Sequence, residues 1–363
     1  MGAIQIKNSA LTLRAGKRAI AHIRQHGLQP ADIAILPGAA GGPKGIGLQG
    51  LDLALFGDWL PRAPRQRSLI GASIGSWRFA SACLPDPVAG IKRLGELYTS
   101  QRYAKGVSMK EVSQSCRQLL NDLLQGEDAA ILTNPLYQLN IVVVKSRGLL
   151  VHDRKGALGL GLSAVIGNNL LGRQRLARHF ERLIIHDARA QPPLHKLEDF
   201  KTHFHTLTTQ GLRQSLMASA SIPLVMEAVR EIPGIGPGTY RDGGLLDYHL
   251  DLPYAGDGLV LYPHFTDRVV PGWFDKSLLW RNGDATRLQD VVLIAPSSAY
   301  LASLPHGKLP DRRDFSRYMG DDDGRELYWR KAMAESTRLG EEFLELCETG
   351  ALVDRLLPLR GSA

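Results

Sequence analysis

Two consecutive segments of the chain share the order apolar strand, glycine-rich turn, helix. The first runs from a buried strand at 32–36 through a glycine-rich turn to a helix at 44–60. The second runs from a strand ending near Ile70 through a tight turn to a helix that reaches Leu84, after which prolines prevent its continuation. Parallel strands need long crossover connections, usually helices that pack on the sheet. The repeated order therefore predicts an α/β protein with a mostly parallel central sheet.

The other elements are predicted from hydrophobic spacing and from the positions of glycine and proline. We expect one main domain over 1–305, followed at 306–363 by a charged linker (308–324) and an amphipathic helix (325–348) packed on that domain. A loop and turn segment is predicted at 233–248, and the apolar, glycine-rich segment 156–172 stays unassigned. Helices are predicted at 10–26, 88–103, 108–125 and from Thr209 to before Pro223, and strands at 137–145, 182–187, 201–208, 258–263 and 290–295.

The chain has a formal charge of +8, from 44 Lys and Arg against 36 Asp and Glu. Its basic residues cluster loosely at 62–67, 173–182 and 312–317, without the interleaved aromatic side chains of a base-stacking platform. No nucleic-acid partner is therefore expected. The same clusters leave open a peripheral contact with an anionic membrane surface. The sequence does not predict the oligomeric state.

The cysteines, the acidic run and the apolar runs indicate which cofactors and which cellular location to expect. Three scattered cysteines, without a CxxC pair, disfavour a disulfide framework and a zinc site. The acidic run at 321–323 lacks the ligand spacing of an EF-hand, so no metal and no cofactor is expected. Neither a signal peptide nor a membrane span is visible, and a cytoplasmic location is the default expectation.

The turn of the second unit has the pattern G-x-S-x-G, in which Ser73 lies between Gly71 and Gly75. A sharp turn between a strand and a helix needs small residues on both sides of the serine and holds its hydroxyl at the carboxyl end of the strand. The N-terminus of the following helix offers free N–H groups, starting at Ile74, to a negatively charged oxygen. Ser73 is therefore the candidate nucleophile.

The turn of the first unit contains Gly41, Gly42, Lys44 and Gly45. It is not a phosphate-binding P-loop, because Pro43 precedes the lysine and a glycine follows it. Successive small residues allow backbone N–H groups to converge on a negative oxygen, as an oxyanion hole requires. Lys44 would add local positive charge to that site.

A nucleophilic serine needs a base, and Asp242 precedes Gly243 and Gly244 on a tight turn after a predicted strand. Direct hydrogen bonding and partial burial could make this carboxylate a sufficient base. The alternative is a Ser-His-Asp triad with His249 or His264, which follow Asp242 in the chain order of some hydrolases.

Together, the glycine turn at 41–45, the G-x-S-x-G at 71–75, the A-S-x-x-x-P block at 218–223 and the D-G-G at 242–244 resemble the patatin-like phospholipase family. The resemblance implies a three-layer α/β/α fold, with the glycine turn as oxyanion hole. It also implies a Ser73/Asp242 dyad in place of a triad. Two departures stand out: Lys44 replaces the usual arginine, and an aspartate usually precedes the glycines.

The resemblance further implies hydrolysis of lipid acyl esters through an acyl-Ser73 intermediate. The family's substrates include phospholipids, lysophospholipids, galactolipids and triglycerides. Because the oxyanion turn departs from the family pattern, a catalytically silent lipid- or acyl-binding protein on the same fold is the alternative.

Overall fold

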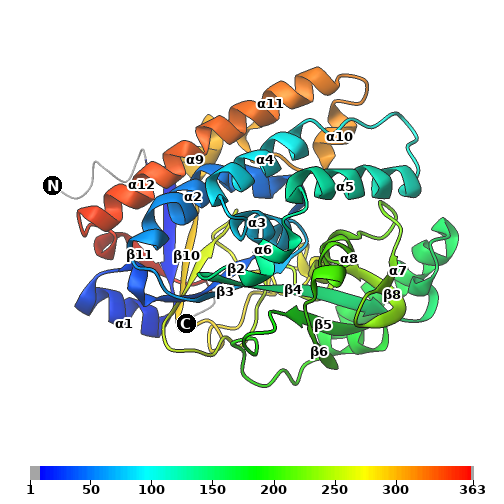
Figure 1. The fold of residues 1–363 in the computed structure, drawn as a ribbon, viewed down its shortest axis with the longest axis horizontal. Coiled ribbons are helices and arrows are strands. Elements are labelled where there is room, and N and C mark those ends of the chain that lie inside the picture. The colour runs from blue at the N-terminus through cyan, green and yellow to red at the C-terminus, as the bar shows by residue number, and fades with distance from the viewer. Residues whose placement is uncertain (1–8, 361–363) are drawn as a thin grey trace.

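The computed structural model describes residues 9–360 and has a large, mixed β-sheet at its centre (Figure 1). Eleven strands of this part of the chain form the sheet, in the order β11-β1-β10-β9-β2-β3-β4-β5-β6, with β8 paired to β4 and β7 to β8. The strands are Leu11–Ala15 (β1), Ile33–Gly38 (β2), Arg67–Ala72 (β3), Tyr137–Ser146 (β4), Phe180–His186 (β5), Thr202–Thr206 (β6), Val229–Ile232 (β7), Gly236–Asp242 (β8), Leu259–Pro263 (β9), Val291–Pro296 (β10) and Leu356–Pro358 (β11).

Five neighbouring strands, β10, β9, β2, β3 and β4, run parallel at the centre of the sheet. Antiparallel pairs join β1 to β10 at one side and β5 to β4 at the other. All six residues of β3 are buried, as expected for a strand covered on both faces. The predicted α/β class with a mostly parallel sheet is confirmed.

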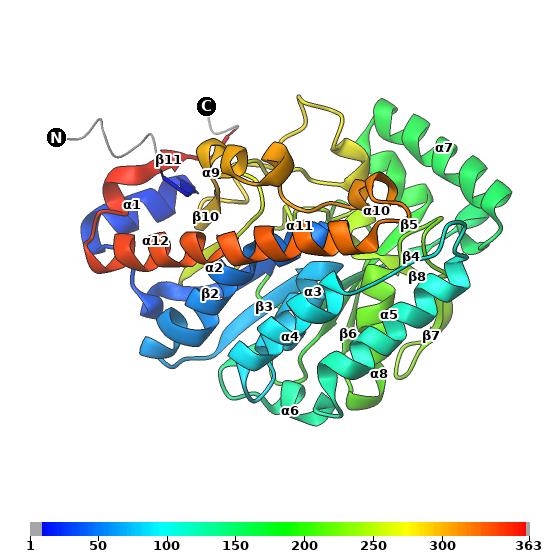
Figure 2. The same cartoon turned by 90° about the horizontal axis from the view of Figure 1, so that it is seen from above.

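Helices cover the sheet, and Figure 2 shows α7 and α8 on opposite sides of strands β4, β5 and β8. The C-terminal helices α11 and α12 lie along α2 and α4 (Figure 2). The α-helices are Lys17–His26 (α1), Gln49–Ala54 (α2), Ile74–Ala82 (α3), Pro87–Thr99 (α4), Met109–Leu124 (α5), Asp128–Thr133 (α6), Lys155–Leu171 (α7), Thr209–Ala220 (α8), Ser298–Ser303 (α9), Arg313–Arg317 (α10), Asp322–Glu335 (α11) and Thr337–Glu348 (α12).

Strands β3 and β8 meet end to end along one edge of β4. Strand β3 runs parallel to β4 up to the pair Ala72 and Val142, and β8 runs antiparallel to β4 from the pair Asp242 and Val143. Both must use the same edge, because β5 occupies the other edge over these residues. The carboxyl ends of β3 and β8 are thus brought together by adjacent positions of β4, and Ser73 follows one of them.

The single helix predicted at 10–26 is wrong in its first half, which forms β1. Leu11, Leu13 and Ala15 alternate with less buried residues and pair with β10. The spacing of Leu11 and Ala15 also fits one face of a helix, so the local pattern did not distinguish the two structures. Gly16 separates β1 from α1, and a Cβ there would overlap the backbone of Leu288.

The segment predicted as loop and turn at 233–248 contains β8, so that prediction is wrong in part, while the strand expected before the Asp242 turn is confirmed. Its glycines and prolines suggested a loop, but Gly236–Asp242 pairs with β7 on one side and β4 on the other. The unassigned segment at 156–172 forms α7, whose side chains Leu158 and Val165 pack against Val144 of the sheet.

The charged linker predicted at 308–324 is largely structured and includes α10. Asp314 is completely buried, accepting hydrogen bonds from Lys308 Nζ (2.7 Å) and Trp329 Nε1 (3.1 Å).

The single helix predicted at 325–348 is divided at Ser336, whose hydroxyl accepts a hydrogen bond from Gly50 N (2.8 Å) in α2. The contact between Gly50 and Ser336 spans 286 residues, so local patterns could not predict the division of this helix.

Candidate active site

Ser73 lies at the sharp turn between β3 and α3 and has a positive φ of 56°, with ψ −130°. A positive φ is costly for a residue with a side chain and is characteristic of strained functional positions. The turn closes because its flanking glycines lack side chains: a Cβ on Gly71 would lie 2.5 Å from Ser76 Cα, and one on Gly75 would overlap the carbonyl of Gly38. Both predicted turn glycines are therefore sterically required.

Three hydrogen bonds fix the backbone of this turn. Ser73 N donates to Ser219 Oγ (2.9 Å), which itself donates to the carbonyl of Val142 (2.8 Å). The carbonyl of Ser73 accepts from Ser76 Oγ (2.7 Å) and from Ser76 N (3.0 Å). Ser219 belongs to the A-S-x-x-x-P block, and two residues later Ser221 accepts a hydrogen bond at its carbonyl from Asp242 N (3.1 Å). The block therefore supports both members of the predicted dyad.

Asp242 ends β8 and contacts Ser73 directly. Its Oδ2 accepts a hydrogen bond from Ser73 Oγ at 2.7 Å, and its Oδ1 accepts one from Gly244 N at 2.7 Å. Both side chains are buried, at 3% and 5% exposure. Burial raises the pKa of Asp242 to about 6, although the hydrogen bond from Ser73 and the positive charge of Arg312 oppose that rise. Asp242 thus remains ionised at neutral pH but is more basic than an exposed carboxylate.

The glycines after Asp242 allow close packing of its turn. A Cβ on Gly243 would overlap the carbonyl of Val142, and one on Gly244 would lie 2.6 Å from Ala40 Cβ. Gly244 also has to present its N–H to the carboxylate. The D-G-G pattern thus has a steric basis at both glycines.

The glycine turn at 41–45 lies beside Ser73. Gly42 has φ 58° and lines the same cavity as Ser73 and Ile74. Within residues 9–360, the N–H groups of Gly41 and Gly42 donate no hydrogen bond to a protein acceptor. Gly45 lets α3 approach, because a Cβ there would lie 2.7 Å from Ile74 Cγ1. Free N–H groups beside a nucleophile are what an oxyanion hole requires.

The side chain of Lys44 does not line this cavity. Its Nζ lies 4.7 Å from the ring centre of Phe265, a cation–π contact. Burial lowers the pKa of Lys44. The positive charge predicted at the oxyanion turn is therefore directed at an aromatic ring rather than at Ser73.

His249 and His264, the candidates for a triad, are fully buried and contact each other, with ring centres 4.2 Å apart. The Nδ1 atom of each ring accepts a hydrogen bond from a nearby backbone N–H. Val270 N donates to His249 (3.0 Å), and Thr266 N donates to His264 (3.0 Å). Burial lowers both pKa values, that of His264 to about 3. Among the described residues, no histidine hydrogen-bonds to Ser73 or Asp242, so the geometry favours the dyad.

Two cavities meet at the dyad. The larger, of about 340 Å³, contains Ser73 and is otherwise lined mainly by apolar and aromatic side chains, including Trp77, Tyr98 and Met226. The smaller, of about 250 Å³, contains Asp242 and Gly244. Residues shared by the two linings are Ile222, Val225 and Arg312.

Arg312 was not predicted as a site residue, because it stands in the presumed linker. It is partly buried, lines both cavities and approaches the oxyanion turn, with its Nε 3.2 Å from where a Cβ of Gly42 would lie. The only sequence signal was its membership of the basic cluster at 312–317. That cluster does not indicate which arginine points inward.

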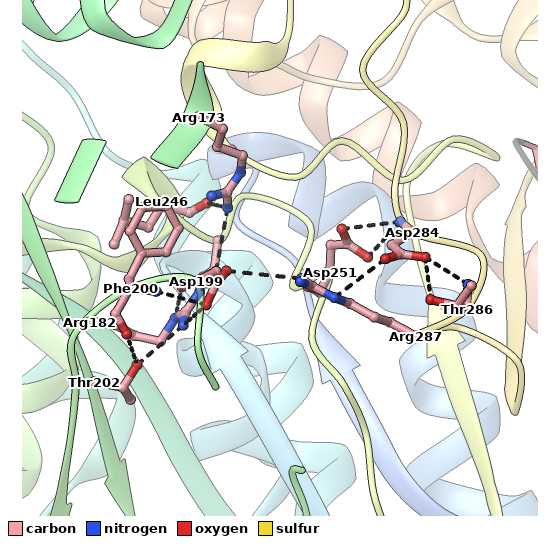
Figure 3. A network of polar contacts seen from close by, with 12 residues as sticks. Arg173, Arg182, Asp199, Phe200, Thr202, Leu246, Asp251, Asp284, Thr286 and Arg287 are labelled. Atoms are coloured by element: carbon pink, nitrogen blue, oxygen red, sulfur yellow. Dashed lines mark hydrogen bonds and ion pairs between the residues drawn. The ribbon is translucent and has the colours of Figure 1, made fainter. Parts of the chain in front are cut away.

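The segment after Asp242 is anchored to β5 by a buried ion pair. Arg182 Nε donates to Asp247 Oδ2 (2.7 Å) and its Nη2 to Asp247 Oδ1 (2.8 Å), with both side chains at most 1% exposed. Arg182 Nη1 also donates to Asp199 Oδ1 (2.8 Å), and Arg173 donates to the carbonyl of Leu246 (2.6 Å) (Figure 3). The arginines thus hold the chain that leaves the base turn.

No family model matches the chain, and no curated protein matches it at a significant level. Within residues 9–360, no helix has both the length and the apolar character needed to cross a bilayer.

Proposed function

We propose that this protein is a serine-dependent lipid acyl hydrolase that uses Ser73 and Asp242 as a dyad, on a three-layer fold like that of the patatin-like phospholipases. The observation that carries the proposal is the 2.7 Å hydrogen bond from Ser73 Oγ to Asp242 Oδ2, on a strained turn that faces a cavity. A nucleophile and its base within hydrogen-bond reach are the basic requirement for covalent acyl transfer.

In the proposed reaction, Ser73 Oγ attacks the ester carbonyl and its proton passes to Asp242. The N–H groups of Gly41, Gly42 and Ile74 stabilise the negative oxygen of the tetrahedral intermediate. The intermediate collapses, the carbon–oxygen bond of the ester breaks, and the departing alcohol takes the proton from Asp242. Water then attacks the acyl-Ser73 ester with Asp242 as base, releasing the fatty acid and returning the proton to Ser73.

The apolar lining of the larger cavity supports a fatty acyl group as its occupant. This cavity is lined by Ser73 and by Gly42 of the oxyanion turn, whereas the smaller cavity is lined by the base that protonates the leaving group. We therefore assign the acyl chain to the larger cavity and the alcohol portion to the smaller one.

The outer face of α7 supports a substrate presented in a lipid surface. After Lys155 the helix has no charged residue, and its outward side chains are unusually apolar for a surface helix. Its end residue Leu171 is 70% exposed and Leu160 is 68% exposed, while Leu162 on another face lines the smaller cavity. Exposed basic residues flank the helix, which suits an anionic bilayer: Arg154, Lys155, Arg175 and Arg178.

A fluorophosphonate probe tests the proposal, because it forms a covalent bond only with an activated serine. We expect stoichiometric labelling of Ser73 in the wild type, located by mass spectrometry of the labelled peptide, and none in Ser73→Ala. Hydrolysis of a panel of phospholipids, lysophospholipids and acylglycerols should be lost in the same variant. A folded wild type that is not labelled would indicate a silent lipid-binding protein instead.

The activity is expected to rise with pH through about 6 and then reach a plateau. Only ionised Asp242 can accept the Ser73 proton, and burial raises its pKa to about 6. Below that pH, kcat/KM should fall about tenfold per pH unit, since it follows the ionisation of one group in the free enzyme. The measurement is a kcat/KM profile from pH 4.5 to 9 with a soluble ester. A midpoint near 4 would contradict the role assigned to burial.

A further inference from the structure

The smaller cavity at the dyad has an unneutralised cation at its wall. Arg312 is partly buried there, yet within residues 9–360 its guanidinium makes no hydrogen bond or ion pair. The carboxylates on either side of it in the chain pair with another cation. Asp311 Oδ2 lies 2.9 Å from Lys308 Nζ, and Asp314 accepts a hydrogen bond from the same lysine. A guanidinium withdrawn from bulk water without a partner is costly, so such a group commonly serves a ligand.

A second cation lies near the same cavity. Lys276 Nζ is 5.0 Å from the ring centre of Tyr248 and 5.8 Å from that of Trp273, and both rings line the cavity. Within the described chain, this ammonium group has no carboxylate partner. Partial desolvation and the like charges of Lys44 and Arg312 lower its pKa to about 8, although the negative charge of Asp311 opposes that shift. This side of the site therefore attracts anions.

The carboxylate that remains in the cavity is the base itself. Asp242 accepts one hydrogen bond at each oxygen, from Ser73 and from Gly244, and makes no ion pair with Arg312, although the positive charge of Arg312 lowers its pKa. Asp322 lines the larger cavity, and its Oδ1 lies 3.4 Å from Arg325 Nη2, so this carboxylate has a cation of its own. Arg312 lies where the two cavities meet, and Lys276 lies beside the smaller cavity alone, so the positive charge is greater on the alcohol side of the scissile ester.

We propose that the smaller cavity binds the alcohol portion of an acyl ester that carries a phosphate group, and that Arg312 selects this group. The planar guanidinium offers two parallel donors to phosphate oxygens, and Lys276 adds a point charge at the rim. The inference rests on the proposed function and deepens it. It makes Arg312 a specificity-determining residue beside the oxyanion turn.

The test compares two esters with the same oleoyl chain, 1-oleoylglycerol 3-phosphate and 1-oleoylglycerol, in the same detergent micelles. The wild type should favour the phosphate ester in kcat/KM. Arg312→Gln should lower the ratio of the two kcat/KM values by about 10- to 100-fold, as expected for loss of a bidentate charge-assisted contact. Arg312→Lys should restore part of the ratio.

The neighbouring Arg313 gives a matched control, because it is exposed and lines neither cavity. Arg313→Gln removes the same charge one residue away and should leave the ratio unchanged. An equal effect in both variants would attribute the preference to net charge and overturn the inference. An equal loss on both esters in Arg312→Gln would overturn it too, because it would indicate a role in chemistry or folding.

Two further measurements remain. The first distinguishes a phosphate ester from free phosphate as the ligand, and the second distinguishes failure of the phosphate subsite from failure of the proposed hydrolase function. Glycerol 3-phosphate should inhibit more strongly than inorganic phosphate, and the reverse would indicate a site for free phosphate. If the wild type hydrolyses neither ester and Ser73 is not labelled, the proposed function fails. Calorimetry of glycerol 3-phosphate binding then tests the subsite alone: binding lost in Arg312→Gln supports it, and no binding to wild type overturns it.

Discussion

Replacing Asp242 by asparagine is expected to lower kcat for acyl esters by about 10²- to 10⁴-fold, the range typical of a lost general base. The amide has the size of the carboxylate and can keep the contacts with Ser73 and Gly244, so the geometry of the turn should survive. It cannot take the Ser73 proton. Steady-state kinetics on a soluble ester, with Ser73→Ala as the reference for complete loss, measure the effect.

The same variant should be as stable as the wild type at pH 7, or more stable by roughly 1–3 kcal/mol. Burial raises the pKa of Asp242 to about 6, above the value of an unfolded aspartate. Between pH 4 and 6 the folded state therefore binds more protons at this carboxyl than the unfolded state, and wild-type stability falls as the pH rises. Urea unfolding of both proteins at pH 4.5 and 7 tests this. A strongly destabilised variant would mean that Asp242 is structural.

Replacing Arg182 by methionine is expected to reduce the free energy of unfolding by about 3–5 kcal/mol, since it leaves the buried carboxylate of Asp247 with only a 3.8 Å ion pair to Arg173. Arg182 is fully buried and contacts Asp247 through two hydrogen bonds. Asp199 is a second acceptor (Figure 3). Urea unfolding at pH 7 measures the loss. Adding Asp247→Asn should recover part of the lost stability, because the asparagine side chain carries no charge that needs a partner.

Arg62 provides the matched control for this variant. It also contacts two carboxylates, Asp58 and Glu348, but its side chain is 41% exposed. Surface ion pairs contribute about 0–1 kcal/mol, so Arg62→Met should change stability by less than about 1 kcal/mol. Similar losses in the two variants would show that burial is not what gives the Arg182 pairs their importance.

The elements predicted correctly are those in which local sequence and tertiary environment favour the same structure. In the Ser73 turn, small residues at 71 and 75 allow a sharp bend, and the apolar β3 is buried in the sheet. Residues 11–15 are the opposite case. Their spacing fits one face of a helix, but they form β1 because they pair with β10 in the folded sheet.

The parts of the candidate site that were not predicted depend on contacts between distant residues. Nothing near Arg312 in the sequence indicates that it faces the cavities, whereas Arg313 beside it is exposed. The support that Ser219 gives to Ser73 crosses 146 residues of chain. The dyad itself could be proposed from motifs, but its 2.7 Å contact depends on the register of strands far apart in the sequence.

The meeting of β3 and β8 on one edge of β4 bears on how such a chain can diverge. Ser73 and Asp242 are 169 residues apart, yet adjacent ladder positions, Val142 and Val143, set their spacing. A shift of one residue in either ladder would displace a partner by about 3.3 Å and break the contact. Surface connections can therefore lengthen or shorten without changing the dyad, whereas an insertion or deletion within β4 would abolish it.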